Sequence, residues 1–211
     1  KILPIFLFLC YNLFMFFIIS QIMGGIALIL VFISYFLRNK VTFLAFQIVA
    51  NFFYALSFVF TNALVAGINS LISIIRCIVF YLYNRKNQDI PWFYLIIFSV
   101  LYVSTGVIFF KSYFDIIVIF TPILFTFAMM MKNMEKVRYL MILPNILLTF
   151  YGILCEVYTT AALDFMEVIT IIVAIIKFYI KDKNKKFDSV YSDIDEENYK
   201  KVKKIIQDKR F

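Results

Sequence analysis

The chain has 211 residues, of which 64% are hydrophobic, 20% are aromatic and only 16% are charged. This composition excludes a soluble globular domain, because such a domain would expose large contiguous apolar patches to water. The net charge of +8 does not indicate nucleic-acid binding, because the basic residues lie between and after the apolar segments, where they set membrane topology.

Apolar segments of about twenty residues follow one another along most of the chain. A helix rises about 1.5 Å per residue, so about twenty residues cross a hydrocarbon core of about 30 Å. The segments lack the apolar–polar alternation of barrel strands, so we predict an all-α, polytopic transmembrane helix bundle. The predicted spans are Ile2–Ile18, Gln21–Leu37, Val41–Phe60, Ala63–Tyr83, Pro91–Phe110, Tyr113–Met131, Val137–Cys155 and Ala161–Ile180.

The first of these segments allows three arrangements. Only Ser20-Gln21 and Gly24-Gly25 interrupt the apolar sequence between it and the next span. Residues 1–19 are therefore predicted as an extra N-terminal hydrophobic helix, as part of one longer tilted helix with the next span, or as a leader resembling a signal peptide.

Charge alternates strictly from one loop to the next. Every second loop is basic, and the intervening loops are neutral or acidic. The positive-inside rule then places the basic loops and the C-terminus of this multi-pass membrane protein in the cytoplasm. The basic positions are Arg38, Lys40, Arg85, Lys86, Lys132, Lys136, Arg138, Lys181, Lys183, Lys185 and Lys186.

The spans before and after Pro91–Phe110 resemble each other in order and in loop charge. The matching stretches are about a hundred residues apart: Arg38-Asn39 with Lys132-Asn133, Lys40–Leu44 with Lys136–Leu140, Phe53–Leu56 with Phe150–Ile153, and Ile74–Arg76 with Ile175–Lys177. Because one helix separates two sets of three, the two repeats are expected to be parallel, with a substrate site between them near the midplane. The predicted organisation is an N-terminal helix (1–19), repeat 1 (20–83), linker helix (84–112), repeat 2 (113–180) and cytoplasmic polar tail (181–211).

The polar tail permits two interpretations. It is either a solvated tail or a short interfacial helix in which Tyr199, Val202, Ile205 and Ile206 share one face and the lysines contact anionic lipid.

Several of these stretches resemble the YgjV-type bacterial inner-membrane proteins over residues 21–180. The resemblance rests on Gln21–Gly24, Phe46-Gln47, Ser73–Tyr81, Met131–Asn133, Lys136–Leu140 and Asp164. It implies the membrane fold, and its layout is similar to that of the SWEET and semiSWEET sugar transporters and the PnuC-type vitamin-precursor transporters. The Pro-Gln pair typical of the sugar transporters is absent, which argues against a sugar substrate.

Polar residues recur at helical spacing within the spans, so each set shares one face. We expect these faces to point into the bundle, because polar groups in hydrocarbon need partners. The alternative for each residue is a hydrogen bond that only joins helices. Arg76 and Lys177 have long side chains that can instead reach the headgroups, and Asp164 and Glu167 can instead be exposed at the outer surface. The sets are Gln47, Asn51 and Tyr54; Asn69, Ser73 and Arg76; Asn145, Thr149, Gly152 and Glu156; and Asp164 and Glu167.

Helix-bending residues occur at similar depths in both repeats. Gly24 and Gly25 in the first repeat and Pro122 in the second are candidate hinges, and Pro144 is another. The alternative is that glycine and proline are simply commoner in membrane helices than in soluble ones.

These patterns favour a small-solute transporter that works by alternating access between the repeats. The expected substrate-binding residues are Asn51, Tyr54, Asn69, Ser73, Asn145 and Tyr151, and the expected ion-coupling or structural residues are Arg76, Asp164 and Glu167. An enzyme is not expected, because the chain has no histidine and no phosphate-binding loop. The expected partners are the bilayer and a small polar solute, without cofactor, metal or nucleic acid; a homodimer stays open, and the alternative function is a membrane scaffold.

Overall fold

A computed structural model describes residues 2–60, 64–110, 113–158 and 161–184. All the regular structure in these ranges is α-helical. The helices are α1 (Ile2–Tyr35), α2 (Lys40–Phe60), α3 (Leu64–Arg85), α4 (Phe93–Ile108), α5 (Asp115–Met130), α6 (Met134–Leu154) and an unlabelled helix at residues 161–184. Most of the polar tail, from residue 185 on, lies outside the described residues, as do the loop at 61–63 and Lys111.

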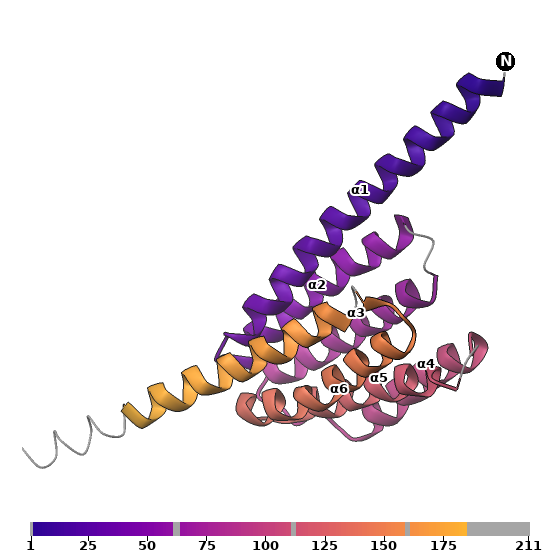
Figure 1. The fold of residues 1–211 in the computed structure, drawn as a ribbon. Coiled ribbons are helices and arrows are strands. Elements are labelled where there is room, and N and C mark those ends of the chain that lie inside the picture. The colour runs from indigo at the N-terminus through magenta and orange to yellow at the C-terminus, as the bar shows by residue number, and fades with distance from the viewer. Residues whose placement is uncertain (1, 61–63, 111–112, 159–160, 185–211) are drawn as a thin grey trace, which may run out of the picture. The chain divides into compact units, whose positions relative to one another are not determined.

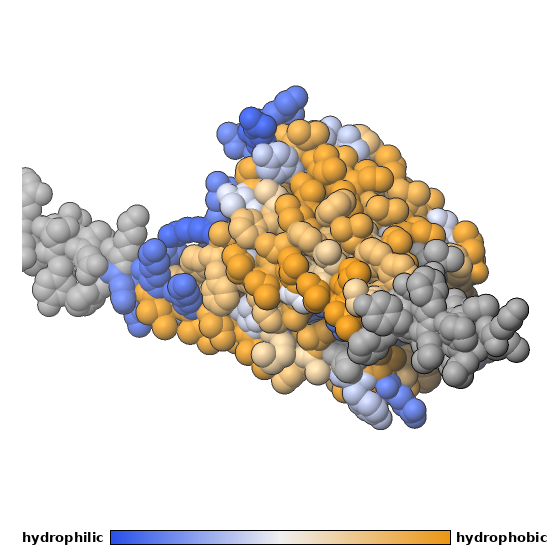
Figure 2. Space-filling model, turned by 90° about the horizontal axis from the view of Figure 1, so that it is seen from above, coloured by the Kyte–Doolittle hydropathy of each residue, from blue (hydrophilic) through white to orange (hydrophobic). Residues whose placement is uncertain are grey.

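Helices α1, α2, α3 and α6 each contain an apolar stretch long enough to cross a membrane, namely Ile18–Tyr35, Lys40–Phe60, Ala66–Arg85 and Met134–Leu154. Helices α4 and α5 are apolar but shorter. The helices expose many large apolar side chains, and apolar residues cover most of the face in Figure 2. This is the surface that a polytopic protein presents to lipid.

The predicted spans from Val41 onward agree with the helices to within a few residues. The two segments before Asn39 form one helix, α1, which continues without a break through Ser20, Gln21 and the two glycines. This is the second of the three arrangements that the sequence allows. At about 1.5 Å per residue, the 34 residues of α1 reach about 51 Å, well beyond a hydrocarbon core of about 30 Å.

The chain divides into two compact units, Lys1–Ile171 and Ile172–Phe211. In the first, α1 packs along α2, α2 along α3, and α5 along α6, while α4 contacts both α3 and α5 (Figure 1). In the second, residues 172–184 are helical.

Small polar groups hold α1 against α2. The Ser20 hydroxyl donates to the Ser57 carbonyl at 3.0 Å, and the Ser57 hydroxyl donates to the Ser20 carbonyl at 2.9 Å. Further along, Gln47 Nε2 donates to Ser34 Oγ at 2.9 Å. A Cβ on Gly24 would lie 3.4 Å from Ser57 Oγ, so the glycine permits this close approach.

Two asparagines lie directly before helices α2 and α6 and cap them. Asn39 Oδ1 accepts from the Val41 amide at 2.9 Å, and Asn133 Oδ1 accepts from the Glu135 amide at 2.8 Å. Each asparagine satisfies an amide that has no partner within its own helix.

Candidate functional site

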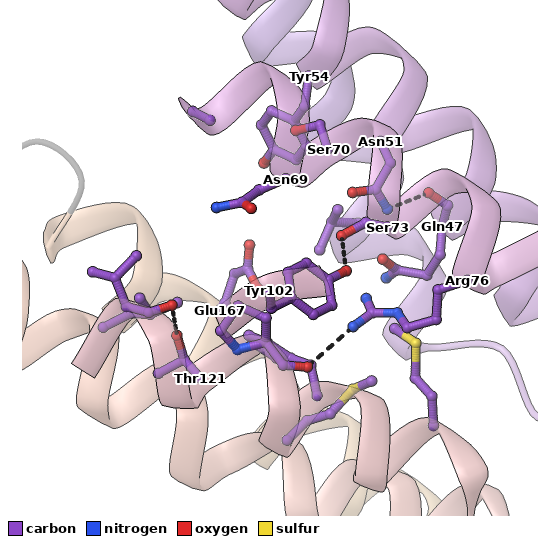
Figure 3. Close-up of a pocket in the computed structure, with 18 of the residues that line it drawn as sticks. Gln47, Asn51, Tyr54, Asn69, Ser70, Ser73, Arg76, Tyr102, Thr121 and Glu167 are labelled. Atoms are coloured by element: carbon purple, nitrogen blue, oxygen red, sulfur yellow. Dashed lines mark hydrogen bonds between the residues drawn. The ribbon is translucent and has the colours of Figure 1, made fainter. Parts of the chain in front are cut away.

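A cavity of about 360 Å³ lies inside the first unit, among α1, α2, α3, α4, α5, α6 and the start of the last helix. This volume is within the range of ligand sites, about 300–1,000 Å³. Figure 3 shows polar side chains from several helices gathered around it. Its polar lining consists of Tyr35, Gln47, Asn51, Tyr54, Asn69, Ser70, Ser73, Arg76, Tyr102, Thr121 and Glu167.

Two of the polar sets predicted from helical spacing, here called stripes, have all their residues in the cavity lining. One consists of Gln47, Asn51 and Tyr54 on α2, and the other of Asn69, Ser73 and Arg76 on α3. The amide of Asn51 donates to the Gln47 carbonyl at 2.7 Å, and the hydroxyls of Ser73 and Tyr102 lie 2.9 Å apart. Four of the six expected substrate-binding residues, Asn51, Tyr54, Asn69 and Ser73, are therefore lining residues.

Pro122 lines the cavity from within α5, which continues on both sides of it. Because proline has no amide proton, the carbonyl of Val118 loses its helical partner. Thr121 Oγ1 donates to that carbonyl at 3.4 Å and partly replaces the lost bond. The carbonyl of Pro122 accepts from Thr126 Oγ1 at 2.6 Å and from Arg76 Nη1 at 3.2 Å.

Arg76 is the cationic lining residue, and it is only 4% exposed. Besides the Pro122 carbonyl, its Nη1 donates to Thr126 Oγ1 at 2.9 Å, and its Cζ lies 5.6 Å from the centre of the Tyr102 ring. Its Nε is buried without a hydrogen-bond partner. The alternative that Arg76 reaches the headgroups is wrong, because acceptors on α5 hold the guanidinium inside the bundle.

Glu167 is the acidic lining residue. Its carboxylate accepts a hydrogen bond from the Tyr35 hydroxyl at 3.1 Å. Asp164, one turn earlier on the same helix, interacts electrostatically with Glu167, and its Oδ2 is buried without a partner. Asp164 is not among the residues that line the described cavities.

A second cavity of about 280 Å³ adjoins the first, since Asn69, Tyr102, Val118 and Pro122 line both. It lies toward the end of the bundle where α4 ends and α5 begins, and Gly106 and Asp115 line it. Tyr151 is in its wall and donates to Asp115 Oδ1 at 3.0 Å.

The remaining predicted residues lie elsewhere. Asn145 is buried, and its Nδ2 has no hydrogen-bond partner, but it lines neither cavity. Gly152 packs so closely on Ala161 that an added Cβ would lie 2.9 Å from that residue's backbone nitrogen. Glu156 follows α6 in a left-handed conformation, with φ 59°. The predicted hinges Gly24, Gly25, Pro122 and Pro144 all lie inside continuous helices.

Two basic residues treated as loop charges in the sequence are buried. Both lie where α1 and α5 end and α2 and α6 begin, here called the basic end. Arg138 donates through Nε to the Tyr35 carbonyl at 3.0 Å and through Nη2 to the Leu37 carbonyl at 2.6 Å. Lys40 Nζ donates to the Met131 carbonyl at 2.6 Å. Each cation therefore satisfies carbonyls that a helix end leaves free.

Sequence reasoning also missed Tyr35 and Tyr102 as lining residues. Their hydroxyls face Glu167 and Ser73, respectively. Tyr102 could have been found, because α4 packs beside α3 and Tyr102 then lies opposite the polar stripe of α3. Tyr35 is one of many aromatic residues in the chain, and nothing in its neighbourhood distinguishes it.

Comparisons with known proteins gave one match. The family model Imp-YgjV, described as bacterial inner membrane protein, matches residues 18–182. No curated protein and no solved structure gave a significant match. The matched residues include α2 to α6 and both cavities. The chain therefore belongs to the Imp-YgjV family and is a multi-pass protein of the bacterial inner membrane.

Proposed function

We propose that the protein carries a small polar solute across the membrane by alternating access between two three-helix repeats. The observation that carries this proposal is the cavity of about 360 Å³, whose lining includes two complete polar stripes on α2 and α3. Polar groups inside a membrane protein are retained at a cost, and those around a cavity most often serve a bound solute or ion.

The helix order supports the two-repeat arrangement. Helices α1 to α3 precede α4, and three further helices follow it, so both sets run in the same direction through the membrane. The paired caps Asn39 and Asn133 occupy matching positions in the two sets. In such transporters the solute site lies where the repeats meet, and the repeats rock around it.

The basic end supplies the proposed closed gate. Arg138 bonds to the backbone of Tyr35, whose side chain lines the cavity, and Lys40 joins the start of α2 to the end of α5. With basic loops on the cytoplasmic side, this gate faces the cytoplasm. The second cavity then extends the first toward the opposite side.

The proposal is tested first by ligand-dependent stability in detergent. A panel of sugars, nucleosides, vitamins and amino acids is screened for a rise in the unfolding temperature, because a ligand at a hundred times its Kd stabilises the folded state by about 2.7 kcal/mol. Uptake of each hit into proteoliposomes follows. Asn69→Ala is expected to abolish both effects, since Asn69 lines both cavities, and Ser104→Ala on the exposed face of α4 is the matched control. Absence of both binding and uptake would contradict the proposal.

A membrane scaffold is the second candidate, and one observation favours it. Several polar residues already have partners on neighbouring helices, as Ser20 has in Ser57 and Gln47 has in Ser34. If the polar residues only join helices, Asn69→Ala lowers the unfolding temperature and no solute raises it. Transport predicts the reverse: little change in stability and a loss of uptake.

A further inference from the structure

A basic and an acidic side chain, Arg76 and Glu167, line the main cavity, and among the described residues neither forms an ion pair. Within the described part of the chain, Arg76 donates to the Pro122 carbonyl and to Thr126 Oγ1, lies over the Tyr102 ring, and has no hydrogen-bond partner at Nε. Glu167 accepts one bond from the neutral Tyr35 hydroxyl. No salt bridge of either residue is present among the described residues.

Unpaired charges inside a protein are costly, because burial removes the hydration that stabilises them. A neutral solute supplies no opposite charge to the guanidinium of Arg76 or to the carboxyl of Glu167. A solute with a single charge compensates one of them. A solute that carries a carboxylate and a cationic nitrogen compensates both, provided that it spans the cavity from Arg76 to Glu167.

We propose that the solute is a small zwitterion of the free amino acid or betaine class, an inference that rests on the proposed transport function. Its carboxylate binds the guanidinium of Arg76, and its cationic nitrogen binds Glu167; both side chains line the cavity. A guanidinium suits this task because its planar donors match a carboxylate in pairs.

The rest of the lining sets the size and character of the solute. Tyr54, Phe58, Tyr102 and Phe125 present aromatic surface to the cavity. Aromatic faces attract a cationic nitrogen and also accept apolar groups. The cavity volume of about 360 Å³ lies near the lower limit for ligand sites, which favours a single amino acid over a peptide.

The test uses the purified full-length protein and matched sets of probes. The twenty L-amino acids and glycine betaine are screened for a rise in unfolding temperature and for Kd. Each amino acid that binds is compared with its amide, which lacks the carboxylate, and its N-acetyl form, which lacks the cationic nitrogen. Both derivatives are expected to bind about 10- to 100-fold more weakly, since each loses a charge-assisted bond.

Variants then assign each end of the solute. Arg76→Gln is expected to weaken the amino acid about 10- to 100-fold and to leave the amide almost unchanged, so the preference for acid over amide disappears. Glu167→Gln is expected to remove the preference over the N-acetyl form in the same way. Arg76→Lys keeps the charge and is expected to bind at an intermediate strength. A purely structural role would weaken all three probes equally.

Two outcomes would overturn the inference that the solute is a zwitterion. If a neutral solute binds and is taken up, and Arg76→Gln does not change its Kd, the zwitterion inference fails while the transport proposal stands. If no amino acid or betaine binds, the inference also fails, and proteoliposome uptake of the uncharged panel decides separately whether transport survives.

Discussion

Two buried arginines differ in how completely the protein uses their donors. Arg138 at the basic end is 1% exposed, and Arg76 in the cavity wall is 4% exposed. Arg138 bonds through Nε and Nη2 to two carbonyls at the end of α1. Arg76 bonds through Nη1 and leaves Nε without a partner. The two arginines are equally buried and carry the same charge. Their hydrogen bonds therefore distinguish the structural residue, Arg138, from the candidate ligand-binding residue, Arg76.

The same contrast extends to the regions around the two arginines. At the basic end, Lys40 and Arg138 satisfy carbonyls that α1 and α5 leave free, which stabilises the fold. Around the cavity, the Nε atom of Arg76 lacks a partner. Unmet bonds cost stability and are retained where function needs them.

The largest effect is expected for Arg138→Gln. The substitution removes two charge-assisted bonds and leaves helix carbonyls unsatisfied, so we expect a loss of about 3–5 kcal/mol in the free energy of unfolding. Equilibrium unfolding in mixed micelles measures it. Lys136→Gln, an exposed position on the same helix, is the control and is expected to change little. If both variants are equally stable, the basic end does not depend on Arg138.

Lys40→Met is expected to cost about 1.5–3 kcal/mol, because methionine keeps most of the aliphatic stem but loses the bond to the Met131 carbonyl. The same unfolding measurement applies. Combining it with Arg138→Gln sharpens the comparison: additive losses mean two independent contacts, whereas a smaller combined loss means that the two cations act as one latch.

Arg76→Gln is expected to change the free energy of unfolding by less than about 1 kcal/mol, although it removes an equally buried guanidinium. Glutamine is too short to reach Thr126, but the Thr126 hydroxyl keeps its own bond to the Pro122 carbonyl, and replacing a buried charge is often neutral or stabilising. A loss as large as that of Arg138→Gln would break the comparison, since Arg76 would then be a structural residue.

Much of the fold could be predicted from the sequence, because a bilayer imposes one helix length and one loop-charge pattern. The predicted span Val41–Phe60 differs from α2 by one residue. A continuous α1 was one of three arrangements that the sequence allowed, and the sequence could not choose among them, since glycines and a Ser-Gln pair weaken a helix without ending it. Only the three-dimensional structure shows whether one helix continues through Ser20–Gly25 or two helices meet at these residues.

The candidate site was predicted where polar residues repeat at helical spacing. This rule found Gln47, Asn51 and Tyr54, which line the cavity, but it also selected Asn145, which does not. The spacing shows which residues share a helix face, but not whether that face lines a cavity or packs on another helix. The role of Arg138 was missed for a similar reason. A basic residue near a helix start fits the positive-inside rule whether its side chain faces water or a neighbouring carbonyl.

The smallest effect is expected at Lys132, which forms an ion pair with Asp89 at 2.5 Å near the basic end. The two side chains are 77% and 71% exposed, so water screens their attraction and Lys132→Met is expected to cost less than about 0.5 kcal/mol. Lys40→Met, the same change at a buried lysine whose ammonium donates to a backbone carbonyl, is expected to cost several times more. Unfolding at low and high salt separates the two cases, because added salt weakens exposed pairs far more than buried bonds. If Lys132→Met costs as much as Lys40→Met and the loss disappears in salt, charge in the loops holds the basic end together. If only Lys40→Met is costly and salt does not change its effect, the contacts with backbone carbonyls hold the basic end together.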